Sequence, residues 1–182
     1  MFSHRFVSAS AIVALTLALP LANAGNALAT SRDKVFFSSV SGQWKGPGEI
    51  VAGKYKGTKF TCNLTGETPD DKIGMSLDGS CRVGVFSQPM KAVVAQAGSG
   101  YKGKFLDGAA GKGLDIVSGS VRGNSVVMGI NRQKLNGAMV ARMASDNTMN
   151  ITISVKVGET LVPVIGLTLQ RDPDSIQVGA IK

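Results

Sequence analysis

Residues 42–64, GQWKGPGEIVAGKYKGTKFTCNL, open the stretch that decides the fold, which runs on to Cys81. The stretch holds the only tryptophan of the chain, Trp44, a dense group of lysines and both cysteines. A tryptophan in the first strand of a small β domain usually closes one end of the core, because its burial removes about 150–250 Å² of surface from water. We therefore expect Trp44 to be buried, with stacking on a ligand as its alternative role.

The two cysteines, Cys62 and Cys81, lie 19 residues apart in segments that both have the pattern of a strand. A pair of cysteines in an exported protein usually forms a disulfide. Two sulfur ligands are too few for a structural metal site. The sequence therefore predicts a disulfide, which restricts the unfolded chain by about 3 kcal/mol in the entropic model, and it predicts no metal or other cofactor.

The N-terminal residues 1–24 have the features of a secretory signal peptide. Arg5 gives a positive start, residues 7–21 are mostly apolar, and small residues precede a cleavage site before Gly25. A second possible cleavage site lies before Thr30. No later run approaches the ~18 apolar residues of a membrane-spanning helix. We expect an exported protein of the bacterial envelope, either periplasmic or secreted.

Cleavage before Gly25 leaves 158 of the 182 residues, enough for one domain with a real core. We place a single β domain at 25–171 and a flexible tail at 172–182. Loss of Arg5 lowers the formal net charge from +8 to +7. A protein surface with this positive charge attracts anionic partners, such as envelope polysaccharides or acidic proteins. The alternative is that the charge only keeps the protein soluble.

Cleavage also removes His4, the only histidine of the chain. Without histidine, Ser-His-Asp and Cys-His catalysis and nearly every catalytic zinc site are excluded. An enzyme would have to work with carboxylates, lysine or tyrosine alone. We therefore expect a binding protein, with no catalytic residues and no enzymatic activity.

Most of the chain alternates apolar and polar residues with the period of a half-buried strand. The clearest runs are 73–77, 81–85, 126–130, 149–155 and 162–169. Turn signals separate such runs, at Asp78-Gly79, Asp107-Gly108, Gly123-Asn124, Asn136-Gly137 and Ser145-Asp146-Asn147. About ten to twelve short strands joined by hairpins favour an all-β antiparallel barrel, with a β-sandwich as the alternative.

Two segments are less regular. Residues 30–40 are compatible with a short helical turn capped by Thr30 or Ser31. Residues 134–145, KLNGAMVARMAS, are rich in alanine and methionine, which suits a helix, but their alternation favours a strand. An outer-membrane barrel is disfavoured because the chain has only seven Phe, two Tyr and one Trp to form aromatic girdles.

Three motifs suggest chemistry but lack the context that it needs. Residues 98–103 match the dinucleotide pattern G-x-G-x-x-G but precede no helix. Ser99 and Lys102 match the S-x-x-K element of serine β-lactamases, whose K-T-G element is missing. The paired carboxylates, Asp70-Asp71 and Asp172-Pro173-Asp174, are interpreted as exposed turn residues.

A basic cluster follows the first strand. Lys54, Lys56 and Lys59 surround Tyr55, and basic residues around an aromatic ring are suited to grip an anionic polymer. We take these four residues as a candidate anion-binding surface, with a solvated hairpin turn as the alternative. Nucleic acid is not the partner that we expect.

Gly42-Gln43-Trp44 in the first strand, after a short turn segment, resembles the calycins, the lipocalin-like and fatty-acid-binding-like barrels with bacterial protease-inhibitor barrels as relatives in shape. In that group a first-strand tryptophan commonly packs under an arginine near the last strand. The resemblance implies that Trp44 and Arg171, in GLTLQR, form a structural closing pair. Because a small barrel can enclose one ligand, we expect the protein to hold a small apolar or amphipathic molecule in its barrel. The alternative is a filled barrel that acts through its basic surface on a protease or an envelope polysaccharide.

Overall fold

The computed structural model describes residues 24–106 and 113–172, with side chains from residue 31 onward. The apolar stretch of the predicted signal peptide, the predicted turn at Asp107-Gly108 and the predicted tail beyond Asp172 lie outside the described residues. Asp172 itself is tied to the first strand, because its backbone N–H donates to the carbonyl oxygen of Gln43 at 2.9 Å.

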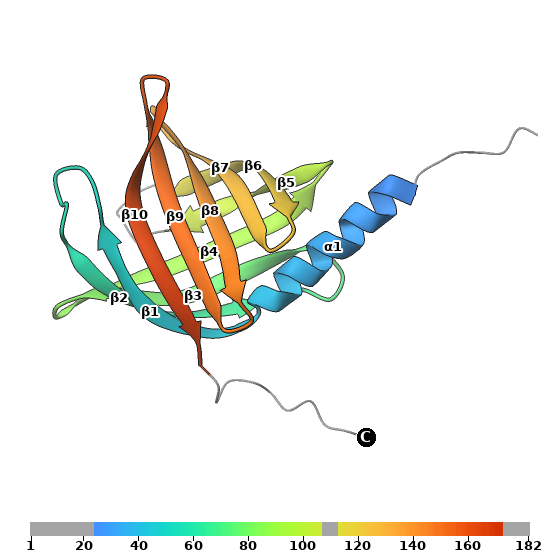
Figure 1. Cartoon of the computed structure of the whole chain (residues 1–182), viewed down its shortest axis with the longest axis horizontal. Helices are drawn as coiled ribbons and strands as arrows, with labels where there is room; N and C mark the ends of the chain where they lie inside the picture. Colours follow the sequence, from blue (N-terminus) through green and yellow to red (C-terminus); the bar gives the residue numbers. More distant parts are fainter. Residues whose placement is uncertain (1–23, 107–112, 173–182) are drawn as a thin grey trace, which may run out of the picture.

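The described chain forms one helix followed by ten strands (Figure 1). Their bounds are α1 Ala24–Val40, β1 Gly42–Ile50, β2 Lys59–Glu67, β3 Gly74–Val83, β4 Phe86–Ala97, β5 Gly100–Leu106, β6 Leu114–Arg122, β7 Ser125–Arg132, β8 Leu135–Ser145, β9 Thr148–Val157 and β10 Thr160–Arg171. Each strand pairs antiparallel with the next, and β10 pairs with β1, so the sheet closes on itself. The predicted antiparallel barrel is confirmed, and the sandwich alternative is wrong.

Alternation of the side chains produces this barrel. In β7, Val126, Met128 and Ile130 are buried, and the residues between them are more exposed. The segment that is rich in alanine and methionine is β8, with Ala141 and Met143 buried, which confirms the predicted strand. The interior is therefore apolar, whereas a transmembrane barrel has a polar interior and an apolar outer face.

Two of the predicted turns are wrong. Asp78-Gly79 lies inside β3, where Gly79 has a φ of 152°. A Cβ atom there would come within 2.2 Å of the carbonyl oxygen of Asn63, so the glycine allows a close approach of β2 rather than a turn. Asn136-Gly137 lies inside β8, and the chain turns before it, at Gln133 with a φ of 54°.

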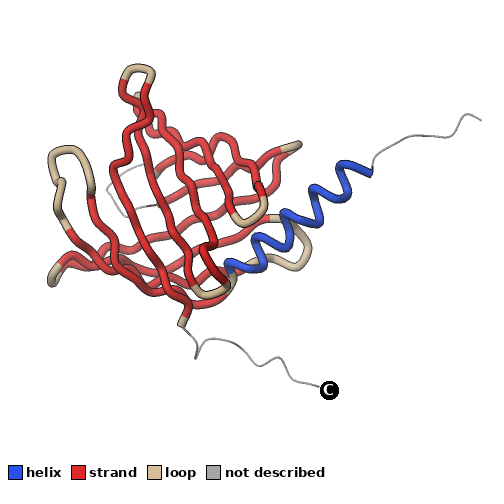
Figure 2. The backbone as a smooth tube through the Cα atoms, in the orientation of Figure 1, coloured by secondary structure: helices blue, strands red, loops and turns tan. Residues whose placement is uncertain are grey.

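The helix is longer than the predicted short turn. It covers 17 residues and begins at Ala24, before the capping residues expected from sequence, and Ala27, Leu28 and Ala29 in the added part have high helix propensity. Phe36, Phe37 and Val40 are all buried, and their spacing places them on one face of the helix. Figure 2 shows the helix in blue against one end of the barrel. No helix within the described residues is long and apolar enough to cross a membrane.

The up-and-down order of strands gives the barrel two different ends. We call the end covered by α1 the closed end; there β1 begins, β10 ends, and β8 turns into β9. The opposite end, the open end, carries the connections β1–β2, β3–β4, β7–β8 and β9–β10. In Figure 1 the tips of the β1–β2 and β9–β10 connections lie at the left and top, away from the helix.

Candidate functional site

An apolar cavity of about 220 Å³ lies inside the barrel. Phe36 and Val40 of α1 line it at the closed end, whereas Phe60, Phe105 and Leu114, near the open end, are half-buried. The other lining residues are Cys62, Leu64, Met75, Leu77, Cys81, Met90, Ala92, Val94, Val126, Met128, Met139, Ala141, Met149, Ile151, Ile153, Ile165 and Leu167. All of these side chains are apolar, so the described part of the lining offers no charged or polar side chain to a ligand inside the cavity.

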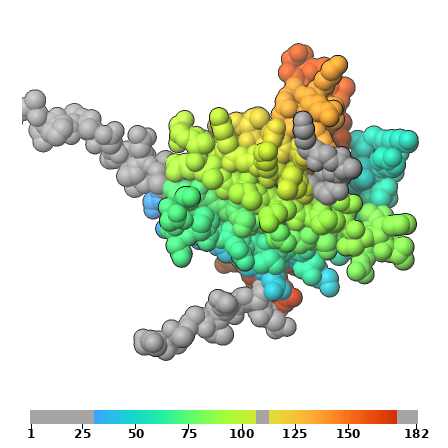
Figure 3. All heavy atoms as spheres, turned by 180° about the vertical axis from the view of Figure 1, so that it is seen from behind, coloured from blue at the N-terminus to red at the C-terminus, as the bar shows by residue number. Residues whose placement is uncertain are grey.

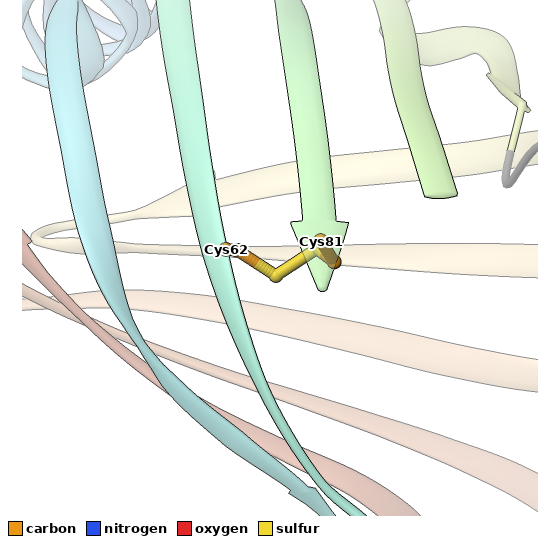
Figure 4. Close-up of a disulfide and its surroundings, with 2 residues drawn as sticks. All are labelled: Cys62 and Cys81. Carbon is orange, nitrogen blue, oxygen red and sulfur yellow. A yellow bond between two sulfur atoms is a disulfide. The ribbon is translucent and has the colours of Figure 1, made fainter. Parts of the chain in front are cut away.

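The disulfide is part of this lining. Cys62 of β2 and Cys81 of β3 are direct partners across the two strands, with Cα atoms 4.0 Å apart (Figure 4). The predicted disulfide is therefore confirmed. It fixes two neighbouring strands of the cavity wall to each other.

The space beside Gly48 in β1 is filled by the ring of Phe60 from β2. A Cβ atom on Gly48 would come within 2.4 Å of that ring. The glycine therefore lets Phe60 lie against the backbone of β1, and this ring forms part of the cavity wall.

The closed end is held by Trp44 and Arg171, which are direct partners across β1 and β10. Trp44 is fully buried, and its indole N–H donates to the carbonyl oxygen of Val40, at the end of α1, at 2.8 Å. The guanidinium carbon of Arg171 lies 4.3 Å from the centre of the Trp44 ring, which is a cation–π contact. The structure thus brings the two residues together, and their effect on stability remains a prediction.

Arg171 also joins the barrel to the end of the helix. Its two terminal nitrogens donate to the carbonyl oxygens of Ser41 and, at 2.6 Å, of Ser39. These carbonyls lie at the negative end of the helix dipole, where a cation is favourable. Burial lowers the pKa of Arg171, and the nearby Asp146 opposes this effect.

A second link between helix and barrel was missed by the sequence reasoning. The hydroxyl of Tyr101 in β5 donates to the carboxylate of Asp33 in α1 at 2.7 Å, and the Phe37 ring lies 4.9 Å from the Tyr101 ring. Burial raises the pKa of Tyr101, and the hydrogen bond to Asp33 raises it further. Phe36 and Phe37 lie four and three residues before Val40, and this spacing was the signal for a helix face that packs on the barrel.

The four residues of the candidate anion-binding surface lie together at the open end. Lys54, Tyr55 and Lys56 are in the connection between β1 and β2, and Lys59 begins β2. All four are exposed, and the Lys54 ammonium lies 5.6 Å from the centre of the Tyr55 ring. Their binding of anions remains a prediction.

These residues belong to a larger surface that we call the open rim, residues 49–59, 82–86, 132–135 and 156–161. Its cationic residues are Lys54, Lys56, Lys59, Arg82, Arg132, Lys134 and Lys156. Its acidic residues are Glu49 and Glu159, so seven positive and two negative charges give a formal charge of +5. The described turns of the closed end, 67–74, 97–100, 122–125 and 145–148, carry two positive and four negative charges, a formal charge of −2. The positive charge of the protein is therefore concentrated around the mouth of the barrel.

The discounted motifs do not form a second site. Gly98 and Ser99 form the turn between β4 and β5, and a strand follows instead of a helix. Asp70 and Asp71 are exposed at the closed end, where Asp71 lies 3.8 Å from Lys72 in an ion pair. A hollow of about 370 Å³ with charged residues in its lining lies there, more open to solvent than the interior cavity. Within the described residues no three potential acidic, cysteine or histidine ligands are grouped to bind a metal.

Comparisons with known proteins add little. A scan against protein-family models and a search of curated proteins gave no match. Among solved structures, the chain is similar to a protein of unknown function of the DUF3598 family from Nostoc punctiforme, with 11% identity and a TM-score of 0.48, covering 75% of this chain and 49% of that chain. The chain therefore spans about half the length of that protein, and the likeness adds nothing on function.

Proposed function

We propose that this protein is an exported, non-enzymatic binding protein of the bacterial envelope that holds a small apolar or amphipathic molecule in its barrel, as calycin-like barrels do. The observation that carries the proposal is the cavity of about 220 Å³, whose lining among the described residues consists of apolar side chains. Such a lining favours binding over catalysis, because its described residues place no acid, base or hydroxyl nucleophile beside a ligand.

The size of the cavity limits the ligand. An apolar cavity of roughly 150 Å³ stays dry and binds benzene, whereas sites for drug-sized molecules have roughly 300–1,000 Å³. The cavity of about 220 Å³ lies between these values. We therefore propose a single narrow apolar group as the part of the ligand that enters the barrel.

The residues at the open end of the barrel indicate the chemistry of the part of the ligand that stays outside the cavity. The interior ends near the half-buried Phe60, while Lys59 and Arg82 at the rim are exposed. A molecule with an apolar group inside would place a polar or anionic head among these cations. This arrangement supports an amphipathic ligand over a fully apolar one.

A cavity-filling variant tests the proposal with 1-aminoanthracene, a neutral probe whose fluorescence rises in apolar surroundings. Ala92 in β4 lines the cavity, so Ala92→Leu adds three carbon atoms to the space that the probe would occupy. We expect the probe to bind the unchanged protein and to bind Ala92→Leu at least about tenfold more weakly. The melting temperature should stay equal or rise, since the variant fills a void.

Ala95→Leu is the matched control, because Ala95 lies in the same strand and is exposed. It should leave the affinity for the probe unchanged. Equal affinity in Ala92→Leu and the unchanged protein would show that the probe binds elsewhere and would overturn the proposal.

A further inference from the structure

Exposed apolar side chains gather at the open rim and its margin. Of the fourteen large hydrophobic residues that are exposed in the described chain, nine lie there: Val51, Tyr55, Val83, Val85, Phe86, Leu106, Leu135, Val157 and Leu161. The tip of the β3–β4 hairpin is the extreme case, with Val85 90% and Phe86 78% exposed. Turn positions normally carry Gly, Asn, Asp, Ser or Pro, so apolar tips call for a binding partner.

The tips form separate projections rather than one flat patch. In Figure 3 the hairpins β1–β2 in cyan, β3–β4 in green and β9–β10 in orange project at the right and top of the molecule. A rigid protein partner needs a continuous complementary surface. A fluid bilayer can instead accept several apolar tips independently.

The positive charge of the open rim favours a bilayer that contains anionic lipids. The +5 formal charge of the open rim faces the same way as its apolar tips, and the turns of the closed end carry −2. Lysine and arginine next to inserted apolar residues are the pattern that binds anionic lipid head groups. A soluble polyanion would need the charge but not the apolar tips.

We infer that the open rim docks on the surface of an anionic lipid bilayer, with the tips around Val85 and Phe86 entering the head-group region and the rim lysines facing lipid phosphates. This docking depends on the rim and not on the cavity. Together with the proposed function, it places the mouth of the barrel against the membrane, so an apolar group could enter without crossing water.

The inference is tested by sedimentation of the processed full-length protein with vesicles. Vesicles of equal parts phosphatidylglycerol and phosphatidylcholine should bind it, vesicles of phosphatidylcholine alone should bind far less, and added salt should weaken binding. Val85→Asp should lower the apparent affinity by about tenfold or more, because it puts an anion at the inserted tip.

Val35→Asp is the matched control, since Val35 is also exposed, at 67%, but lies on α1 at the closed end. It should bind vesicles as the unchanged protein does. For the charges, Lys54→Glu with Lys56→Glu should weaken binding strongly, whereas Lys72→Glu at the closed end should not.

Three results would overturn the inference: no binding to anionic vesicles, equal losses in Val85→Asp and Val35→Asp, or no loss in Val85→Asp despite binding. If Val85→Asp bound anionic vesicles as well as the unchanged protein, and heparin competed efficiently with the vesicles, the protein would simply bind polyanions. Ala92→Leu separates this inference from the proposed function, because it should bind vesicles normally even though it excludes the probe. If the unchanged protein bound vesicles but did not bind 1-aminoanthracene, the docking inference would be supported and only the proposed binding in the cavity would be rejected.

Discussion

At the scale of single residues, Arg171 connects the first strand, the end of the helix and the turn between β8 and β9 at the closed end. Its guanidinium covers the ring of Trp44 and donates to carbonyl oxygens of Ser39, Ser41 and Asp146. We expect Arg171→Ala to lower the free energy of unfolding by about 3 kcal/mol, since it removes charged hydrogen bonds and a cation–π contact. The melting temperature should then fall by roughly 10 °C in a thermal denaturation experiment.

Arg142→Ala is the control for this prediction, because Arg142 is an exposed arginine in β8. It should change the free energy of unfolding by no more than about 0.5 kcal/mol. If Arg171→Ala were equally mild, the pair with Trp44 would have no closing role, and this support for the resemblance to calycins would be lost.

At the scale of elements, the contact between α1 and β5 makes stability depend on pH. The pKa of Tyr101 is raised in the folded protein, so the neutral hydroxyl and its bond to Asp33 favour folding. This contribution is fully present below the unfolded pKa of about 10 and is lost as pH rises toward the higher folded value. We predict that stability falls above about pH 10 and that Tyr101→Phe reduces this fall, as measured by urea denaturation across the alkaline range.

Tyr55→Phe controls for the other groups that titrate at high pH, because Tyr55 is the second of only two tyrosines and is exposed. It should keep the full alkaline loss of stability. The same alkaline profile in Tyr101→Phe as in the unchanged protein would argue against a stabilising contact between Tyr101 and the helix.

The elements also show what could be predicted from the sequence. The period of two identifies β7, β8 and β9 because each has one face on the core. The misassigned Asp78-Gly79 has the composition of a turn, but its glycine serves the close approach of a neighbouring strand, which depends on pairing that the local sequence does not encode. The bond between Asp33 and Tyr101 joins residues 68 positions apart and depends on how the helix lies across the barrel.

At the scale of the whole molecule, the net charge was evident from composition, but its distribution was not. The alternation of turns between two ends separates a basic open end from a slightly acidic closed end. The cavity was equally inaccessible to sequence reasoning, because its volume is what remains after side chains from the helix and nine of the strands have packed. The difference between the two ends of the barrel, one covered by α1 and the other surrounded by positive charge, is therefore visible only once the barrel has closed.

The central claim is that the barrel holds a small apolar or amphipathic molecule, and native mass spectrometry of the protein purified gently from its own cells tests it most directly. The account predicts extra mass beyond the processed chain with its disulfide, and loss of that extra mass in Ala92→Leu but not in Ala95→Leu. A bare polypeptide mass, together with no uptake of 1-aminoanthracene, would contradict the account.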